Sequence, residues 1–132
     1  MKNARVFVFS LTLYSFCSLF AQDIKPKDPD ARFFHLDTIS SELISKDQRW
    51  VSFLKGENVL TGLYYLKAGD EDKQRPHDTD EVYYVLKGKA SFTAGGKETE
   101  VSQGSVLFVK ANVAHRFTNI EEDLQVLVFF DQ

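Results

Sequence analysis

Two short stretches of the chain carry side chains of the kinds that bind metal ions. Residues 75–90 read RPHDTDEVYYVLKGKA, with Glu81 four positions after His77, and residues 104–120 read GSVLFVKANVAHRFTNI, which contains His115. Two imidazoles and one carboxylate make up the facial triad that binds a divalent ion and leaves coordination positions open. These residue types therefore predict a site for Fe, Mn, Ni or Zn, provided that the fold brings them together.

Each of these residues also has a simpler interpretation. His77 and Glu81 could form a surface ion pair, which would contribute little to stability. His115 could be a core histidine that is hydrogen-bonded to Asn119 or to the backbone. The metal site is favoured over both, because His115 adds a third donor that completes a known ligand set.

The local sequence decides how His77 and Glu81 are presented. Residues 82–85, VYYV, are β-branched or aromatic and favour a strand over a helix. Pro76 also disfavours helix in the residue before it. Side chains two positions apart share one face of a strand, so we expect an extended segment in which four side chains point the same way: His77, Thr79, Glu81 and Tyr83.

The rest of the chain from Trp50 onward is also typical of β-structure. Short segments rich in Val, Phe, Tyr, Leu and Thr are punctuated by Gly, Asn and Asp, which predicts an all-β sandwich or barrel. Gly95 and Gly96 are expected to form a tight hairpin. Residues 31–39 are expected to begin an edge strand, and residues 40–48 to form one helical turn. The expected strands are residues 50–54, 59–69, 82–88, 89–96, 98–104, 105–110, 115–120 and 124–130.

The N-terminal residues have the layout of a secretory signal peptide. A short basic start is followed by an apolar run from Val6 to Phe20 and by the small residue Ala21. The run is short and interrupted by hydroxyl residues, which argues against a membrane anchor. We therefore predict a signal peptide at 1–21 with cleavage near Ala21, a flexible leader at 22–31, a β-barrel domain at 32–132, and export to the periplasm or out of the cell.

Charge and cysteine content narrow the class of partner. Removal of the signal peptide leaves 14 basic and 19 acidic residues, a net charge of −5, without a basic cluster. A nucleic-acid or anionic-membrane surface would need such a cluster, so we expect a small molecule or another protein as the partner. The single cysteine, Cys17, lies in the signal peptide, so the mature domain has no disulfide and depends on its core.

With these residues in place, the sequence resembles the cupin family, whose members carry the motifs G-x5-H-x-H-x3-4-E-x6-G and G-x5-P-x-G-x2-H-x3-N. The resemblance covers about residues 59–130. It implies a jelly-roll barrel of two sheets, a divalent metal ion, and His77, Glu81 and His115 as its ligands. The first motif falls on Gly69, Arg75, His77, Glu81 and Gly88, and the second on Gly104, Lys110, Asn112, His115 and Asn119.

The chain departs from the family pattern at three positions. Arg75 replaces the first histidine, and a guanidinium has no lone pair to offer a metal. If Arg75 points inward, we expect it to bind a substrate carboxylate or other anion. Lys110 and Asn112 replace the proline and glycine of the turn, but asparagine tolerates a positive φ. Gln74 is a candidate fourth ligand, because QRPHDTDEVYYVLKG is similar to small cupins with Q-x-P-H-x-x-D-E-x-Y-Y-V-L-x-G.

The resemblance implies two classes of function. The first is an exported, metal-dependent enzyme acting on a small molecule, with a dioxygenase preferred to an isomerase or lyase and with Glu81 as a candidate catalytic base. The second is a non-enzymatic module that binds a carboxylate or a sugar. The resemblance also implies a homodimer formed by sheet extension, with residues 31–54 supplying an edge strand. His35 matches no motif and is interpreted as structural, and the aromatic residues are expected to fill the barrel: Tyr83, Phe92, Phe108, Phe117 and Phe129.

Overall fold

The computed structural model describes residues 31–132, and residues 34–132 form one compact unit. The predicted signal peptide and all but the last residue of the predicted leader lie outside the described residues. Within the described part of the chain, no helix has the length and apolar character needed to cross a membrane.

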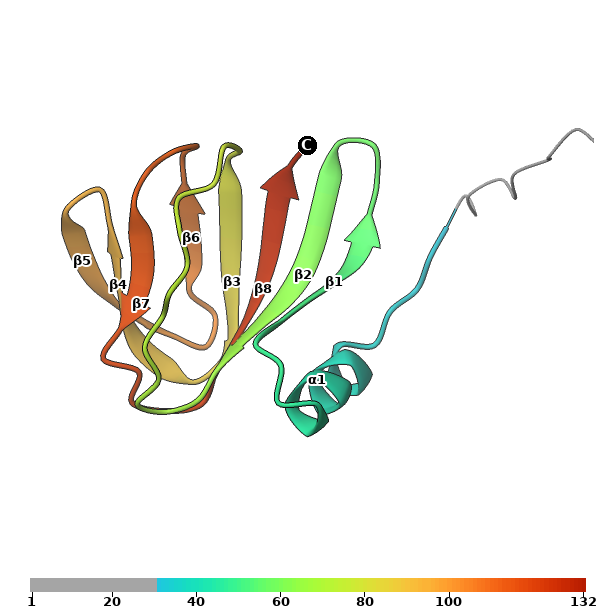
Figure 1. Cartoon of the computed structure of the whole chain (residues 1–132), viewed down its shortest axis with the longest axis horizontal. Helices are drawn as coiled ribbons and strands as arrows, with labels where there is room; N and C mark the ends of the chain where they lie inside the picture. Colours follow the sequence, from blue (N-terminus) through green and yellow to red (C-terminus); the bar gives the residue numbers. More distant parts are fainter. Residues whose placement is uncertain (1–30) are drawn as a thin grey trace, which may run out of the picture. The chain divides into compact units, whose positions relative to one another are not determined.

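Two antiparallel sheets make up the domain, which confirms the predicted double-sheet, all-β architecture (Figure 1). One sheet has five strands in the order β1-β2-β8-β3-β6, and the other has three in the order β5-β4-β7. The strands are β1 (Trp50–Lys55), β2 (Val59–Leu66), β3 (Glu81–Lys87), β4 (Lys89–Ala94), β5 (Lys97–Ser102), β6 (Val106–Val109), β7 (His115–Thr118) and β8 (Leu124–Asp131). β1 lies at the edge of the larger sheet, as expected for the segment 31–54, but the homodimer stays a prediction.

Strand β3 shows how sequence alternation positions the site. Glu81, Tyr83 and Val85 are buried, whereas Val82 and Tyr84 are exposed. This period of two is that of a pleated strand with one face on the core. The face that carries Glu81 and Tyr83 therefore points between the two sheets.

The main core fills the space between the sheets. Aromatic rings occupy its centre, with Phe92 and Phe117 at a centroid separation of 4.8 Å and Tyr83 at 5.7 Å from Phe92. The buried members of this core are Leu66, Tyr83, Val85, Ala90, Phe92, Val101, Val109, Phe117, Ile120, Leu124, Val126 and Val128. Barrel filling is thus confirmed for Tyr83, Phe92 and Phe117, whereas Phe108 and Phe129 are exposed to 59% and 37%.

The N-terminal segment differs from the sequence prediction. Helix α1 (Leu36–Ser45) spans ten residues, so the predicted strand at 31–39 is wrong and the predicted single turn is too short and too late. The helix packs on the outer face of the five-stranded sheet, where Leu43 contacts Leu63 and Tyr65 in a second buried cluster. Burial of Leu43 against a distant strand stabilises the helix, and a local pattern does not report such a contact.

Two turns confirm their sequence predictions. Gly95 and Gly96 connect β4 to β5 with φ of 55° and 78°, the positive values that a two-residue type I′ hairpin requires. Asn112 has φ of 63° in the connection between β6 and β7. Asparagine adopts this left-handed conformation more readily than most residues, so the turn survives the loss of glycine.

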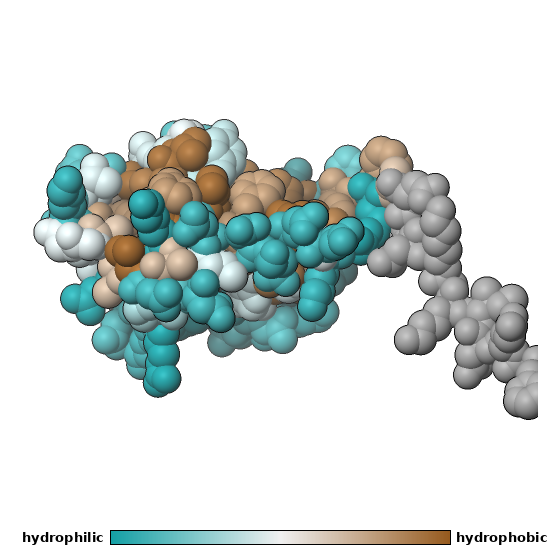
Figure 2. Space-filling view, turned by 90° about the horizontal axis from the view of Figure 1, so that it is seen from above, coloured by the Kyte–Doolittle hydropathy of each residue, from teal (hydrophilic) through white to brown (hydrophobic). Residues whose placement is uncertain are grey.

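Exposed apolar residues lie on the outer face of the sheet away from α1. β3, β6 and β8 are neighbours there, and their cross-strand pairs join Val82 to Phe108 and to Phe129. The exposed members are Val82, Tyr84, Val106, Phe108 and Phe129. On the face in Figure 2, hydrophobic residues gather over the middle and hydrophilic residues predominate along the lower edge.

Candidate metal centre

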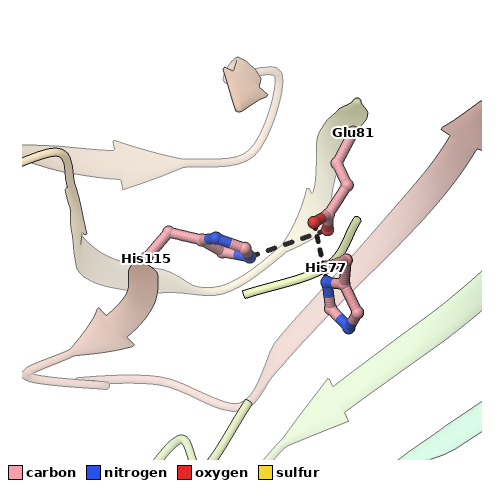
Figure 3. A group of neighbouring side chains, drawn as sticks. All are labelled: His77, Glu81 and His115. Atoms are coloured by element: carbon pink, nitrogen blue, oxygen red, sulfur yellow. Dashed lines mark hydrogen bonds and ion pairs between the residues drawn. The ribbon is translucent and has the colours of Figure 1, made fainter. Parts of the chain in front are cut away.

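His77, Glu81 and His115 lie together, as the sequence predicts (Figure 3). One ligand atom from each residue lies within 4.8 Å of the others. His77 Nδ1 is 2.7 Å from Glu81 Oε1, and His115 Nε2 is 3.6 Å from Glu81 Oε2. Glu81 begins β3 in the larger sheet and His115 begins β7 in the smaller one, so the group spans the space between the sheets.

His77 lies in the loop that precedes β3 and not within a strand. No strand covers residues 67–80, and β3 begins only at Glu81. The turn between β6 and β7 holds this loop in place, because the Asn112 N–H donates to the His77 carbonyl at 2.6 Å and the Ala111 N–H donates to Asp80 Oδ1 at 2.9 Å. The second motif therefore positions the histidine of the first.

The backbone fixes the orientation of the His115 ring. Its Nδ1–H donates to the carbonyl oxygen of Val113 at 2.7 Å, which directs Nε2 toward Glu81. A ligating histidine in proteins usually donates its other ring N–H in this way. The alternative partner Asn119 is not used, since its side-chain amide donates to Glu121 at 3.2 Å.

Two opposing effects set the ionisation of Glu81 and His115. Burial disfavours a charge on Glu81, but hydrogen bonds from His115, Tyr83 and His77 outweigh it and lower the pKa of this carboxyl group. Burial likewise disfavours a charge on His115, but the Glu81 carboxylate and the Val113 carbonyl raise the pKa of the imidazole. The metal-free site therefore favours an ionised Glu81 beside a protonated His115, and an ion would replace that proton.

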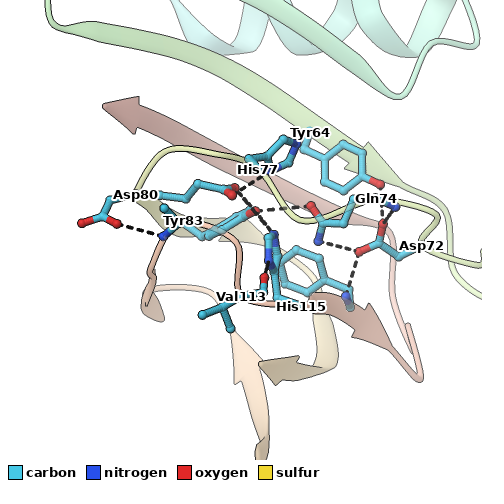
Figure 4. A network of polar contacts seen from close by, with 11 residues as sticks. Tyr64, Asp72, Gln74, His77, Asp80, Tyr83, Val113 and His115 are labelled. Carbon is cyan, nitrogen blue, oxygen red and sulfur yellow. Dashed lines mark hydrogen bonds and ion pairs between the residues drawn. The ribbon is translucent and has the colours of Figure 1, made fainter. Parts of the chain in front are cut away.

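The Tyr83 hydroxyl lies among the predicted metal ligands (Figure 4). It donates to Glu81 Oε2, lies 2.7 Å from His115 Nε2, and lies 3.3 Å from Gln74 Oε1. Burial together with the adjacent Glu81 carboxylate raises the pKa of this phenol, so it stays protonated and donates. The sequence places Tyr83 on the correct face, but its interpretation as barrel filling misses this polar role.

Gln74 is oriented toward the same centre by a buried carboxylate. The Gln74 side-chain amide donates to Asp72 Oδ2 at 2.8 Å, which turns its Oε1 toward Tyr83. Asp72 also accepts from the Tyr64 hydroxyl at 2.7 Å and from the Phe117 N–H at 2.8 Å. Gln74 as a fourth metal ligand stays a prediction. Asp72 is itself buried, with 5% of its surface exposed.

A cavity of about 540 Å³ lies beside the cluster. His77, Gln74 and Tyr83 line it, whereas Glu81 and His115 are not among its lining residues. Arg75 is exposed and does not line this cavity, so the structure does not bring it to the other predicted site residues. The cations on the cavity lining are Arg49 and Lys73, which the sequence interpretation does not include.

The donor set fits a divalent ion. Metal–nitrogen and metal–oxygen bonds are about 2.0–2.2 Å long, so donors on one ion lie about 3 to 4.4 Å apart. Donor atoms already within 4.8 Å of one another need to move by only some tenths of an ångström. His77, Glu81 and His115 would hold the ion, and the Tyr83 hydroxyl would have to give up its contacts with two of them.

Comparisons with known proteins agree with this architecture. Residues 62–130 match the family described as "Cupin domain". An uncharacterised protein of Streptomyces coelicolor, SCO3923, is 47% identical over 97 residues, which cover 74% of this chain and 92% of that protein.

Two solved structures illustrate the likeness of fold. A predicted oxalate decarboxylase from Thermotoga maritima has a TM-score of 0.54 at 22% identity, over 62% of this chain and 77% of that one. KdgF from Halomonas sp. has a TM-score of 0.57 at 17% identity, over 62% of this chain and 76% of that one. Identities this low support the fold alone. The family match covers more than half of the residues and includes all three predicted metal ligands, so the chain belongs to the cupin family.

Proposed function

We propose that the protein is a metal-dependent enzyme of the dioxygenase type that acts on a small molecule bound in the cavity beside His77. The observation that carries this proposal is the convergence of His77, Glu81 and His115 within 4.8 Å of one another, next to a cavity that a small molecule can enter. Two histidines and one carboxylate leave several coordination positions open, the arrangement found in non-haem iron oxygenases.

A bound divalent ion would supply Lewis-acid activation of a chelating substrate and, if it is iron, a position for dioxygen. The side chains of the chain have separate tasks around it. Buried Glu81 and His115 would hold the ion from the core side, whereas His77, with a side chain 39% exposed, lines the cavity. Tyr83 lines part of the cavity and its hydroxyl donates to Glu81 Oε2, so it orients that carboxylate beside the ion. Glu81 remains the candidate catalytic base.

The metal content of the protein, purified without chelator, tests this proposal. We expect close to one equivalent of Fe or another divalent ion in the wild type and strong loss in His115→Ala, which removes a ligand from the core side. His35→Ala is the matched control, because His35 is an exposed histidine that precedes α1. Unchanged metal content in His115→Ala would refute the ligand assignment.

A second candidate function is favoured by the hydrogen bonds of the cluster. Without an ion, Glu81 is already satisfied by Tyr83 and His77, and His115 Nε2 by Tyr83. Such a site can serve as a metal-free module that binds a carboxylate or a sugar. The absence of metal from purified protein, together with carboxylate or sugar binding that persists in the presence of chelator, would support this module over the enzyme.

A further inference from the structure

The cavity beside the metal centre has walls of two different kinds. Strands β1, β2 and β8 contribute Trp50, Leu60, Val128 and Phe130, which are apolar, whereas the 67–80 loop and β3 contribute the polar groups near the metal centre. A volume of about 540 Å³ lies within the usual range for small-molecule sites, roughly 300–1,000 Å³. The cavity can therefore hold a molecule that is apolar on one side and carries metal-binding atoms on the other.

The Trp50 indole lies on the apolar wall in space that is free only because residue 62 is a glycine. A Cβ atom added to Gly62 would lie 2.1 Å from Cη2 and 2.3 Å from Cζ2 of the Trp50 indole, so any other residue would displace the ring. Trp50 is also held edge-on by Phe130, at a centroid separation of 5.8 Å and an interplanar angle of 86°. The indole is nevertheless 37% exposed, so a fixed aromatic surface remains open to a ligand.

The aromatic wall lies close to the metal ligands. The Phe130 ring packs edge-on to the His77 ring, with centroids 5.1 Å apart. Because Phe130 is 5.8 Å from Trp50 and 5.1 Å from His77, the Trp50 and His77 rings lie no more than about 11 Å apart. One aromatic ring with chelating oxygens has the right size to contact Trp50 while its oxygens reach an ion at His77.

The charged residues on the cavity lining do not favour a strongly anionic ligand. The Arg49 guanidinium pairs with Asp70 at 3.2 Å, and the Lys73 ammonium pairs with Glu71 at 3.6 Å. Both cations are thus balanced by acids of the same loop. Recognition must depend mainly on contact with the apolar wall and on the metal.

We propose that the ligand is a planar aromatic compound with two adjacent oxygen donors, such as a catechol, and that Trp50 selects for its ring. This inference depends on the proposed function, because the oxygens need a metal ion. Stacking on a fixed tryptophan adds attraction beyond that of buried area. A chelator with the same oxygens but no ring lacks that contribution.

The test compares a ring chelator with a ringless one on the metal-loaded protein. The probes are 4-nitrocatechol and oxalate, added to the wild type, Trp50→Ala and Gly62→Ala. The chain has one tryptophan, so quenching of its fluorescence in the wild type and Gly62→Ala reports directly on Trp50. The visible spectrum of 4-nitrocatechol reports binding in all variants.

We expect 4-nitrocatechol to bind the wild type about tenfold more tightly than Trp50→Ala, which corresponds to about 1.4 kcal/mol. Gly62→Ala should weaken binding similarly, because it displaces the indole without removing it. Oxalate affinity and metal content should be unchanged in both variants. Phe108→Ala, which removes an exposed aromatic ring from the outer face, is the control and should match the wild type.

The outcomes separate this inference from the proposed function. Equal 4-nitrocatechol affinity in the metal-loaded wild type and Trp50→Ala would overturn the aromatic wall and leave the metal centre intact. Failure of the wild type to hold a metal ion would overturn the proposed function and, with it, this inference. Weaker oxalate binding in Trp50→Ala would also overturn the inference, since Trp50 would then act without a ring to contact.

Discussion

Removal of the Tyr83 hydroxyl should lower the stability of the metal-free protein and raise its affinity for metal. In the metal-free site this hydroxyl contacts Glu81 Oε2 and His115 Nε2, the two atoms that an ion would need on the core side. Tyr83 is 1% exposed, so no water replaces the lost contacts. The hydroxyl donates its single proton to Glu81 Oε2 and accepts a hydrogen bond from protonated His115 Nε2. An ion therefore competes with the hydroxyl for the Glu81 oxygen and with a proton for the His115 nitrogen.

The magnitude follows from the type of hydrogen bond that is lost. A hydrogen bond to a charged group contributes about 1.5–3 kcal/mol, so Tyr83→Phe should lower the free energy of unfolding by about 2 kcal/mol. For a domain of this size, that corresponds to a fall of about 10 °C in Tm. Saturating metal should restore most of the difference, because the ion takes over the lone pairs of Glu81 and His115.

Thermal unfolding with chelator and with saturating Co²⁺ measures both effects, and titration of the Co²⁺ absorption bands gives the affinity. Tyr84→Phe is the matched control, because it removes the same atom from the next residue, which points to the outer face and is 39% exposed. Unchanged metal-free stability in Tyr83→Phe, or a tenfold weaker metal affinity, would refute the reasoning. The second result would instead make Tyr83 a metal ligand.

Three further predictions concern the groups around the site. Asp72→Ala should lower the free energy of unfolding in urea by about 3 kcal/mol, because it leaves buried donors unpaired, whereas the neighbouring, exposed Glu71→Ala should have little effect. Asn112→Val should cost about 1–2 kcal/mol at a φ of 63°, and Asn112→Gly should be tolerated; equal stability of the two would contradict the turn assignment. In metal-free protein, the stability that ionised Glu81 contributes should be lost as pH falls below 4.5, because its pKa is lowered in the folded state. The stability that protonated His115 contributes should be lost as pH rises above 6.5 through its raised pKa. The free energy of unfolding measured against pH should therefore be greatest between these values.

Much of the fold could be predicted because its strands have recognisable sequence patterns. Residues 82–85 alternate between the core and the outer face, and Gly95 with Gly96 favours a tight hairpin. Helix α1 could not be predicted in this way, since the aromatic sequence just before it, at Phe34, is typical of a strand. The helix depends on burial of Leu43 against Leu63, a contact across distant parts of the chain.

The candidate site also has features that the sequence predicts and features that it does not. His77, Glu81 and His115 could be predicted from residue type and spacing, and the structure brings them together. The roles of Tyr83 and Asp72 could not be predicted, because they depend on which buried polar atoms the Tyr83 hydroxyl and the Asp72 carboxylate contact in the core. A period of two places a side chain on a face, but it does not identify the atom that its tip will contact.

The most direct test of the metal centre is anomalous diffraction from crystals of the protein loaded with one divalent ion. The proposed metal centre predicts a single peak at bonding distance, about 2.0–2.2 Å, from one atom each of His77, Glu81 and His115. A peak bonded to other residues, or no peak beside these three side chains in loaded protein, would contradict it.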